Sequence, residues 1–173
     1  KVLLHFEKVL NVCELFDVKV VVLGSPKLRI QFPNFENKII TLFEKIDELF
    51  TSKNIELTIE PNAKIYGGDY FHDITQIVKF INKGKFNKIK TMIDTHNFKL
   101  QKMDSLSSLE NYIHYINHIH ISEIDLKPIE NKSFHHDFSQ KLKEIKYDKI
   151  ITYEVNECEG FLPSISTFSK IYN

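Results

Sequence analysis

Apolar residues along the chain follow two different spacings. At helical spacing they recur in the segments 2–15, 35–51, 74–84, 107–116, 138–145 and 164–172, which predicts amphipathic helices there. Short apolar runs at 18–23, 55–59, 90–93, 118–122 and 150–153 predict buried strands between them. Helices and strands thus alternate, and no Asn-Gly or Asp-Gly turn joins two strands as in a hairpin. This order favours a parallel sheet.

Repeats of about thirty residues match the βα unit of either a doubly wound sheet or a (β/α)₈ barrel. The glycine-rich G-x-G-x-x-G and Walker signatures of nucleotide-binding doubly wound domains are absent from the sequence. We therefore predict an α/β fold of the (β/α)₈ TIM-barrel type, with one domain over residues 1–173.

Local signals mark where several of these elements begin and end. Asn34 precedes the second helix as a candidate N-cap, and Gly84 is a candidate stop for the third. The turn at 24–26 ends the first strand, where the backbone either approaches a ligand or only links strand to helix. We expect the pair His135-His136 in a long polar loop after the fourth strand.

The segment 117–123 places polar side chains on one face of a strand. Alternation puts His118, His120 and Ser122 on one side and Ile119 and Ile121 on the other. Polar groups that face inward on a buried strand need partners, and two imidazoles beside a hydroxyl suggest either a metal or a polar ligand. His118, one pleat deeper than His120, either supports it from behind or belongs to the core.

Four consecutive predicted strands end in a residue that can bind a metal. These residues are Glu60, Asp94, His120 and Glu154. In a parallel barrel all strands point the same way, so these side chains would meet at one mouth, where active sites of this fold lie. Three carboxylates and one imidazole suit a divalent cation such as Mn²⁺, Mg²⁺ or Co²⁺.

Composition limits the remaining choices. The 173 residues are 42% hydrophobic with 23 basic and 23 acidic side chains, so the profile is globular and offers no electrostatic footprint for nucleic acid or an anionic membrane. Cys13 and Cys158 form no Cys-x-x-Cys pair, which favours a reducing cytoplasm. No signal peptide or membrane-spanning run is found, and because the chain starts at Lys1 we expect the beginning of the gene product to be missing.

Five motifs together resemble the xylose-isomerase-like TIM-barrel superfamily, and more narrowly its sugar-phosphate isomerases and epimerases. The motifs are Glu60-Pro61-Asn62 with Ile65-Tyr66-Gly67, then Asp94-Thr95-His96-Asn97, His118-Ile119-His120-Ile121-Ser122-Glu123, His135 ahead of Phe138, and Ile151-Thr152-Tyr153-Glu154. The segment 23–29 is similar to a turn that those proteins carry after their fourth strand. The resemblance covers nearly the whole chain.

The resemblance implies a set of site residues. Glu60, Asp94, His120 and Glu154 would bind the divalent metal, and Glu60 and Glu154 would also transfer protons on opposite faces of the reacting carbon, through an enediolate. Substrate contacts would come from Asn62, His96, Asn97, His118, Ser122, Lys127 and His135. Asn97 stands where the family often has a histidine, so His96 either takes over that contact or points elsewhere.

The resemblance also implies strands four to eight of a barrel without the first three, since a complete barrel needs about 250 residues. Such an arc would expose an apolar edge, so we expect association with another copy or covering by another element.

Three functions follow from this. The first is a metal-dependent isomerase or epimerase with a small sugar as partner, and the second is a non-catalytic barrel remnant or interaction module. The third, an endonuclease-IV-like repair enzyme, would need more histidines and a basic surface, neither of which is seen.

Overall fold

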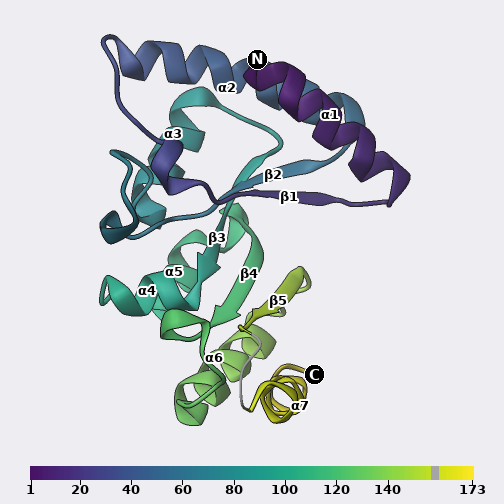
Figure 1. Cartoon of the computed structure of the whole chain (residues 1–173), viewed down its shortest axis with the longest axis vertical. Coiled ribbons are helices and arrows are strands. Elements are labelled where there is room, and N and C mark those ends of the chain that lie inside the picture. The colour runs from purple at the N-terminus through teal and green to yellow at the C-terminus, as the bar shows by residue number, and fades with distance from the viewer. Residues whose placement is uncertain (157–159) are drawn as a thin grey trace. The chain divides into compact units, whose positions relative to one another are not determined.

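The predicted alternation of helices and strands is confirmed. Five strands form one sheet in the order β1-β2-β3-β4-β5 (Figure 1), and the described strand pairs run parallel. Neighbours in sequence are neighbours in the sheet, as in a (β/α)₈ barrel, whereas the strand order of a doubly wound sheet reverses at a switch point. The chain has the fold of an incomplete (β/α) barrel, with five strands instead of eight.

The computed structural model describes residues 1–156 and 160–173, except for the side chain of Leu28; Cys158 lies outside the described residues. The strands are β1 (Val20–Leu23), β2 (Glu56–Ile59), β3 (Ile89–Asp94), β4 (Ile116–Ser122) and β5 (Ile150–Glu154). The helices are α1 (Val2–Leu15), α2 (Phe35–Lys53), α3 (Ile74–Gly84), α4 (Thr95–Leu100), α5 (Ser105–Tyr112), α6 (Lys132–Glu144) and α7 (Phe161–Tyr172). Four 3₁₀ turns are η1 (Pro26–Leu28), η2 (Lys64–Tyr66), η3 (Ile113–Tyr115) and η4 (Ile124–Leu126).

The chain divides into two units, of which the first is Lys1–Met92. In it β1 pairs with β2, and β2 with β3 in the register Ile59 to Thr91. Helix α1 packs on α2 through an edge-to-face contact of Phe6 and Phe50, with ring centroids 5.5 Å apart. Buried Asp47 of α2 accepts hydrogen bonds from the backbone N–H groups of residues 87–89 and so fixes the start of β3.

The second unit, Ile93–Asn173, contains β4 and β5 with α4 to α7 around them. The two strands pair from His118 with Ile150 to Ser122 with Glu154. Ile119 and Ile121 of β4 are fully buried, whereas the histidines share the other face, as the alternation predicts. Helix α7 covers β5 by stacking Phe168 on Tyr153, with ring centroids 5.0 Å apart.

The predicted start of α2 after Asn34 and the predicted end of α3 at Gly84 are confirmed, but their caps differ from the prediction and one histidine pair lies in a different element. Asn34 stands at the N-cap of α2, but its backbone is left-handed (φ 59°) and its side chain caps no N–H. Helix α3 includes Gly84, and the left-handed residue that ends it is Lys85 (φ 54°). The pair His135-His136 lies in α6, not in a loop, because Asn131 caps that helix by accepting a hydrogen bond from the N–H of Phe134.

Helix α4 had no sequence signal that we recognised, because it is only six residues long and too short to show an apolar period. Separately, none of the helices in the described residues is long and apolar enough to cross a membrane.

Candidate active site

Asp94 ends β3 and at the same time caps α4. Its Oδ1 accepts hydrogen bonds from the backbone N–H of His96 at 2.8 Å and from the hydroxyl of Ser122 at 2.6 Å. Its Oδ2 accepts one from the side-chain amide of Asn97 at 2.7 Å. Donors on both oxygens fix the plane of this buried carboxylate, and hydrogen bonds of this kind orient the ligands of metal sites. Asn97 therefore holds Asp94, and the substrate contact predicted for Asn97 stays a prediction.

The end of β4 is tied to the turn that follows β3. The hydroxyl of Thr95 donates to the carbonyl of Ser122 at 2.7 Å and accepts from its N–H at 2.8 Å. The ring Nδ1 of His96 donates to the carbonyl of Glu123 at 2.8 Å. Ser122 and His96 are thus engaged in holding Asp94 and the start of α4, and their role as substrate contacts stays a prediction.

His120 and Glu154 approach each other from the neighbouring strands β4 and β5. Nδ1 of His120 lies 3.2 Å from Oε1 of Glu154. His120 and Asp94 also offer ligand atoms within 4.8 Å of each other. Two ligand atoms that each lie about 2.1 Å from one cation, at right angles, are about 3 Å apart. The spacing and the oxygen and nitrogen chemistry of these donors therefore fit a divalent cation.

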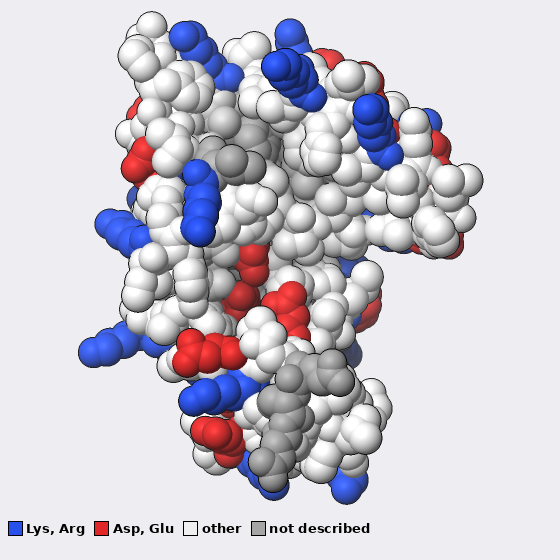
Figure 2. Space-filling model, in the orientation of Figure 1, with Lys and Arg blue, Asp and Glu red and all other residues white. Residues whose placement is uncertain are grey.

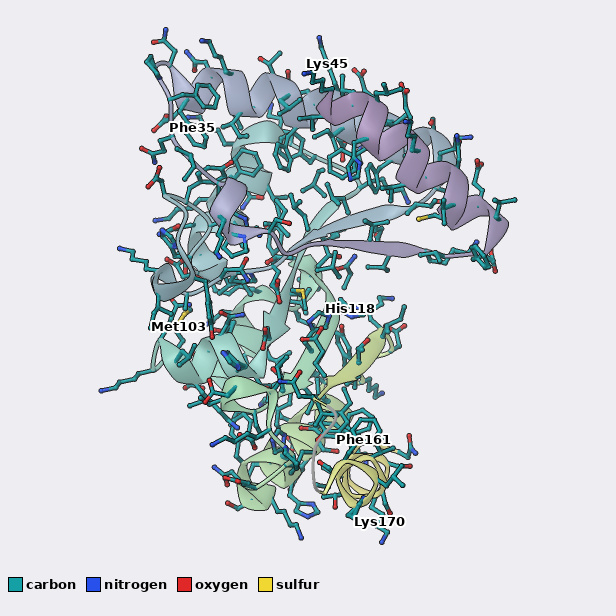
Figure 3. All side chains as sticks on the ribbon, viewed as in Figure 1. Phe35, Lys45, Met103, His118, Phe161 and Lys170 are labelled. Atoms are coloured by element: carbon teal, nitrogen blue, oxygen red, sulfur yellow. The ribbon has the colours of Figure 1, made fainter. Side chains whose placement is uncertain are left out.

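His118, labelled in Figure 3, lies beneath His120 with the two ring centroids 4.9 Å apart. Its Nε2 shares a hydrogen bond of 3.1 Å with the hydroxyl of Thr152. Burial, with the neighbouring His120 adding to it, lowers the pKa of His118 to about 4, although Glu154 acts in the opposite direction. His118 is therefore neutral at pH 7 and packs edge-on against the ring of His120. The substrate contact predicted for it stays a prediction.

A buried polar chain lies next to these residues and connects three helices to the end of β4. Glu123 accepts hydrogen bonds from Lys99 at 2.6 Å and from Nε2 of His135 at 2.9 Å. His135 is fully buried, and its Nδ1 shares a hydrogen bond of 2.7 Å with the hydroxyl of Tyr172. Both ring nitrogens of His135 thus face protein groups, and the substrate contact predicted for it stays a prediction.

Glu123 is held ionised by this chain. Burial alone would raise the pKa of Glu123, but the hydrogen bonds from His135 and Lys99 outweigh it and lower the pKa to about 2. Burial also raises the pKa of Tyr172, and the charge of Glu123 adds to this effect. Glu123 therefore stabilises the folded state in its charged form.

The variant Glu123→Gln should lower the free energy of unfolding at pH 7 by about 2 kcal/mol, the size of a buried hydrogen bond to a charged group. Because the folded pKa is about 2 and the ordinary value is 4.5, this contribution is complete well above pH 4.5 and is lost as the pH falls toward 2. Urea unfolding of both proteins at pH 7, 4 and 2.5 measures it. A difference that does not shrink toward low pH would contradict the assignment.

Glu60 follows β2 in the first unit and lies over the turn that follows β1. A Cβ atom placed on Gly24 would stand 2.5 Å from Oε2 of Glu60. The carboxylate of Glu60 therefore occupies the space that any side chain at residue 24 would need. The turn at 24–26 brings the backbone close to Glu60. That this turn also approaches a ligand, one of the two alternatives left open by its sequence, stays a prediction.

The variant Gly24→Ala should fold normally, because the atom that its methyl meets is the movable end of a side chain. Displacing the Glu60 carboxylate by about 1 Å should still lower catalytic turnover by about a hundredfold. A double-mutant cycle with Glu60→Gln measures whether this loss acts through Glu60. If Gly24→Ala lowers turnover further in the Glu60→Gln background by the same factor, the effect does not act through that carboxylate.

Arg29 is the only arginine of the sequence and was not predicted as a site residue. Its guanidinium donates to the carbonyls of Leu23 at 2.7 Å, Glu60 at 2.8 Å and Phe71 at 3.2 Å. Burial lowers the pKa of Arg29, and the nearby Glu60 partly opposes this. Arg29 thus joins the ends of β1 and β2 to the loop after β2. Such a contact cannot be predicted from the spacing of apolar residues in the sequence.

The two remaining predicted substrate contacts occupy different environments. Asn62 is buried in the first unit, with its Oδ1 lacking a hydrogen-bond partner within the described part of the chain. Its carbonyl receives a hydrogen bond of 3.2 Å from Nδ1 of His72. Lys127 is exposed after η4 in the second unit.

The buried ion pair of Glu123 and Lys99 was not predicted from the sequence, although Glu123 directly follows the His118–Ser122 strand.

Neither a family model nor a curated protein sequence matches the chain, but solved structures do. The chain is similar to 3-keto-D-glucoside 4-epimerase from E. coli, with a TM-score of 0.75 and 12% identity over 88% of this chain and 64% of that one. It is also similar to AP endonuclease family 2 from Brucella melitensis, with a TM-score of 0.79 and 14% identity over 96% and 66%.

A third match is D-psicose 3-epimerase with D-tagatose from Clostridium cellulolyticum H10, with a TM-score of 0.74 and 13% identity over 98% of this chain and 60% of that one. The chain shares the barrel fold of these proteins. It spans 60 to 66% of the length of these three proteins. They include both sugar epimerases and an endonuclease, so the fold leaves the reaction to be argued from the site.

Proposed function

We propose that the chain acts as a divalent-metal-dependent isomerase or epimerase of a ketose or aldose, or of its phosphate. The observation that carries this proposal is the position of His120, whose Nδ1 lies 3.2 Å from Oε1 of Glu154 and which offers a ligand atom within 4.8 Å of one from Asp94. Both oxygens of Asp94 accept hydrogen bonds that fix its orientation. Carboxylate and imidazole ligands that other side chains hold in place through hydrogen bonds are typical of sites for Mn²⁺, Mg²⁺ or Co²⁺.

We propose Glu60 as the fourth ligand, from its place in the sheet. β2 and β3 are adjacent and parallel, with Ile59 opposite Thr91, so Glu60 follows the paired part of β2 as Asp94 completes β3. Carboxyl ends of parallel barrel strands lie on the same side of the sheet. The turn at Gly24 keeps space for the Glu60 carboxylate on that side.

The two glutamates would transfer protons. One glutamate, Glu60 or Glu154, acts as the carboxylate base that removes the proton from the carbon next to the sugar carbonyl, and the other, in its protonated form, donates a proton to the enediolate. A bound divalent cation would supply Lewis-acid stabilisation of negative charge on substrate oxygens. Asp94 keeps its fixed orientation throughout, because Ser122 and Asn97 hold both of its oxygens.

Asn62 is the predicted substrate contact that the geometry supports best. Its buried Oδ1 has no hydrogen-bond donor in the described residues, and leaving such an atom unpaired is costly. A hydroxyl of a bound sugar would supply that donor. We propose the exposed Lys127 as a further contact from the family resemblance alone.

The endonuclease alternative finds no support in the charge of the chain. Basic and acidic side chains number 23 each, and the face seen in Figure 2 shows Lys and Arg side chains dispersed among other residues. Proteins that bind the phosphate backbone of a nucleic acid carry their basic side chains in a patch or stripe on one face. A sugar isomerase or epimerase needs no such surface.

Exchange of carbon-bound hydrogen in deuterated water tests the proposal. The chain, loaded with Mn²⁺, is incubated with D-fructose, D-allulose or D-tagatose, and the proton signals of the carbons beside the carbonyl are followed by NMR. We expect exchange at one such carbon, and its loss after treatment with EDTA. Stoichiometric Mn²⁺ without exchange of any sugar would overturn the catalytic proposal, and absence of both would favour the non-catalytic interaction module.

A further inference from the structure

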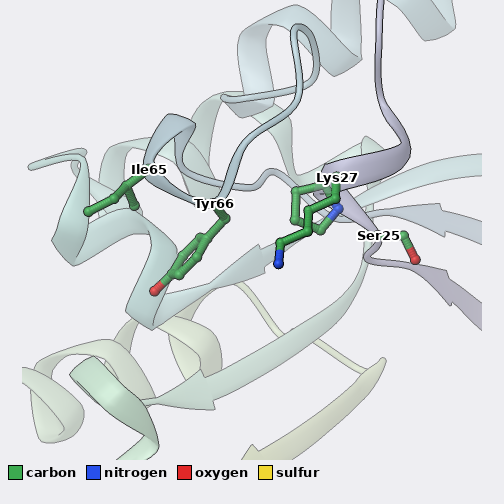
Figure 4. A pocket seen from close by; sticks show the side chains of 5 residues that line it. Ser25, Lys27, Ile65 and Tyr66 are labelled. Atoms are coloured by element: carbon green, nitrogen blue, oxygen red, sulfur yellow. The ribbon is translucent and has the colours of Figure 1, made fainter.

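A cavity of about 570 Å³ in the first unit is lined by residues of α1, α2, the end of β1 and the loops that follow β1 and β2. Its volume lies in the range of small-molecule sites in proteins. It shares only one residue with a neighbouring hollow, which is formed by Ser25, Pro26, Lys27, Ile65 and Tyr66 (Figure 4). The shared residue is Ser25, and the proposed reaction makes no use of the cavity.

Aromatic side chains make up much of the wall of this cavity, namely Phe6, Phe32, Phe43, Tyr70 and Phe71. Phe71 makes edge-to-face contacts with Phe43 and Tyr70, at centroid distances of 6.3 and 4.8 Å. Its backbone is left-handed, with φ 63°, which is uncommon for a bulky residue. Its carbonyl accepts hydrogen bonds from the N–H of Asn62 at 3.1 Å and from Arg29 at 3.2 Å, and these contacts hold Phe71 in the wall.

The rim of the cavity leaves apolar surface uncovered. Ile30 and Phe32 both line the cavity, yet they are 55% and 46% exposed. A flat apolar ligand would cover this surface and would contact the rings in the offset or edge-to-face geometry that aromatic groups prefer.

The lining also contains a buried charge. Arg29 is only 4% exposed, and its hydrogen bonds within the described residues go to three neutral carbonyls, so no carboxylate forms an ion pair with it there. Its Nε–H has no hydrogen-bond partner in the same residues. None of the described residues that line the cavity is acidic, and Lys1 and His5 at its rim are basic. A buried cation without a counter-ion is costly, so an anionic group would be favoured beside it.

We propose that this cavity binds a small aromatic carboxylate, with its ring among the aromatic side chains and its carboxylate at the guanidinium of Arg29. The carboxylate supplies the missing counter-charge and accepts the Nε–H in a charge-assisted hydrogen bond, which is about twice as strong as a neutral one. A sugar suits this lining poorly, because most of its hydroxyls would face apolar side chains. The inference stands apart from the proposed reaction and needs neither metal nor turnover.

Calorimetric titration in EDTA tests this inference. The probes are 2-naphthoate, its neutral analogue 2-naphthamide, and acetate, which has the charge without the ring. We expect one molecule of 2-naphthoate to bind each chain at least about tenfold more tightly than either other probe, and to raise the thermal midpoint. Equal binding of 2-naphthoate and 2-naphthamide would overturn the inference, and so would displacement of 2-naphthoate by D-fructose.

The variant Leu42→Trp should abolish the binding of 2-naphthoate, because the larger side chain fills the cavity from α2. Arg29 is kept, since its loss would also release three carbonyls and disturb the fold. The matched control is Leu49→Trp, the same change at a half-buried residue of the same helix that does not line the cavity. It should keep the wild-type affinity.

Two outcomes for the variants would overturn the inference. The first is unchanged binding of 2-naphthoate by Leu42→Trp. The second is a wild-type chain that binds no 2-naphthoate and sediments as a dimer, when Leu42→Trp makes it a monomer and Leu49→Trp does not. That result would assign the cavity to a second copy of the chain.

Discussion

Replacing Glu154 by Gln is expected to lower the rate of hydrogen exchange on the sugar about a thousandfold, because a general acid or base contributes 10²–10⁴ and Gln cannot exchange protons. The fold should persist, since the side chain of Glu154 is 37% exposed and its carboxylate lies 3.2 Å from Nδ1 of His120. NMR exchange with Mn²⁺ present gives the rate, and circular dichroism gives the fold.

The matched control for this variant is Glu130→Gln, which neutralises an exposed glutamate in the segment before α6. It should exchange the sugar proton at the wild-type rate. Retention of more than about a tenth of the rate in Glu154→Gln would mean that this carboxylate is no proton-transfer group.

Replacing Asp94 by Asn is expected to weaken Mn²⁺ binding by about a hundredfold or more, since changes even to residues behind a ligand cost up to this much. Asn keeps an oxygen that can accept from the N–H of His96, so α4 should stay capped. Calorimetric titration with Mn²⁺, together with the rise of the thermal midpoint as metal is added, measures the change.

Asp104→Asn is the control for this loss. Asp104 caps α5 by accepting from the N–H groups of Leu106 and Ser107 at 3.0 and 3.1 Å, much as Asp94 caps α4. It should bind Mn²⁺ like the wild type, so a comparable loss in both variants would trace the effect to helix capping and would count against Asp94 as a ligand.

The sequence predicted the order of strands and helices because each element carries its own apolar spacing. Every residue of β4 is buried, and α3 has four buried residues at helical intervals. The prediction of helix caps and helix starts failed where a single local contact decides the backbone conformation. Asn34 adopts a left-handed backbone that its residue type permits but does not demand, and Asn131 begins α6 early enough to include His135.

For the site, the sequence predicted the strand-end residues because a strand end can be located from its apolar run. In the second unit Nδ1 of His120 lies 3.2 Å from Oε1 of Glu154, and His120 and Asp94 offer ligand atoms within 4.8 Å of each other, while the role of these residues as metal ligands stays a prediction. The partners of these groups could not be predicted. Ser122 and Asn97 turn toward Asp94, and Glu123 meets His135 from a helix twelve residues away, through contacts that depend on packing and have no period in the sequence.

Arg29 has a thermodynamic consequence for ligand binding. Its guanidinium holds three main-chain carbonyls around the loops after β1 and β2, all within the protein. These loops are therefore ordered before any ligand arrives, and association should freeze few backbone torsions. The entropic cost of binding then falls mainly on the ligand, so a rigid ring form of the sugar should bind with a smaller entropic penalty than its open chain.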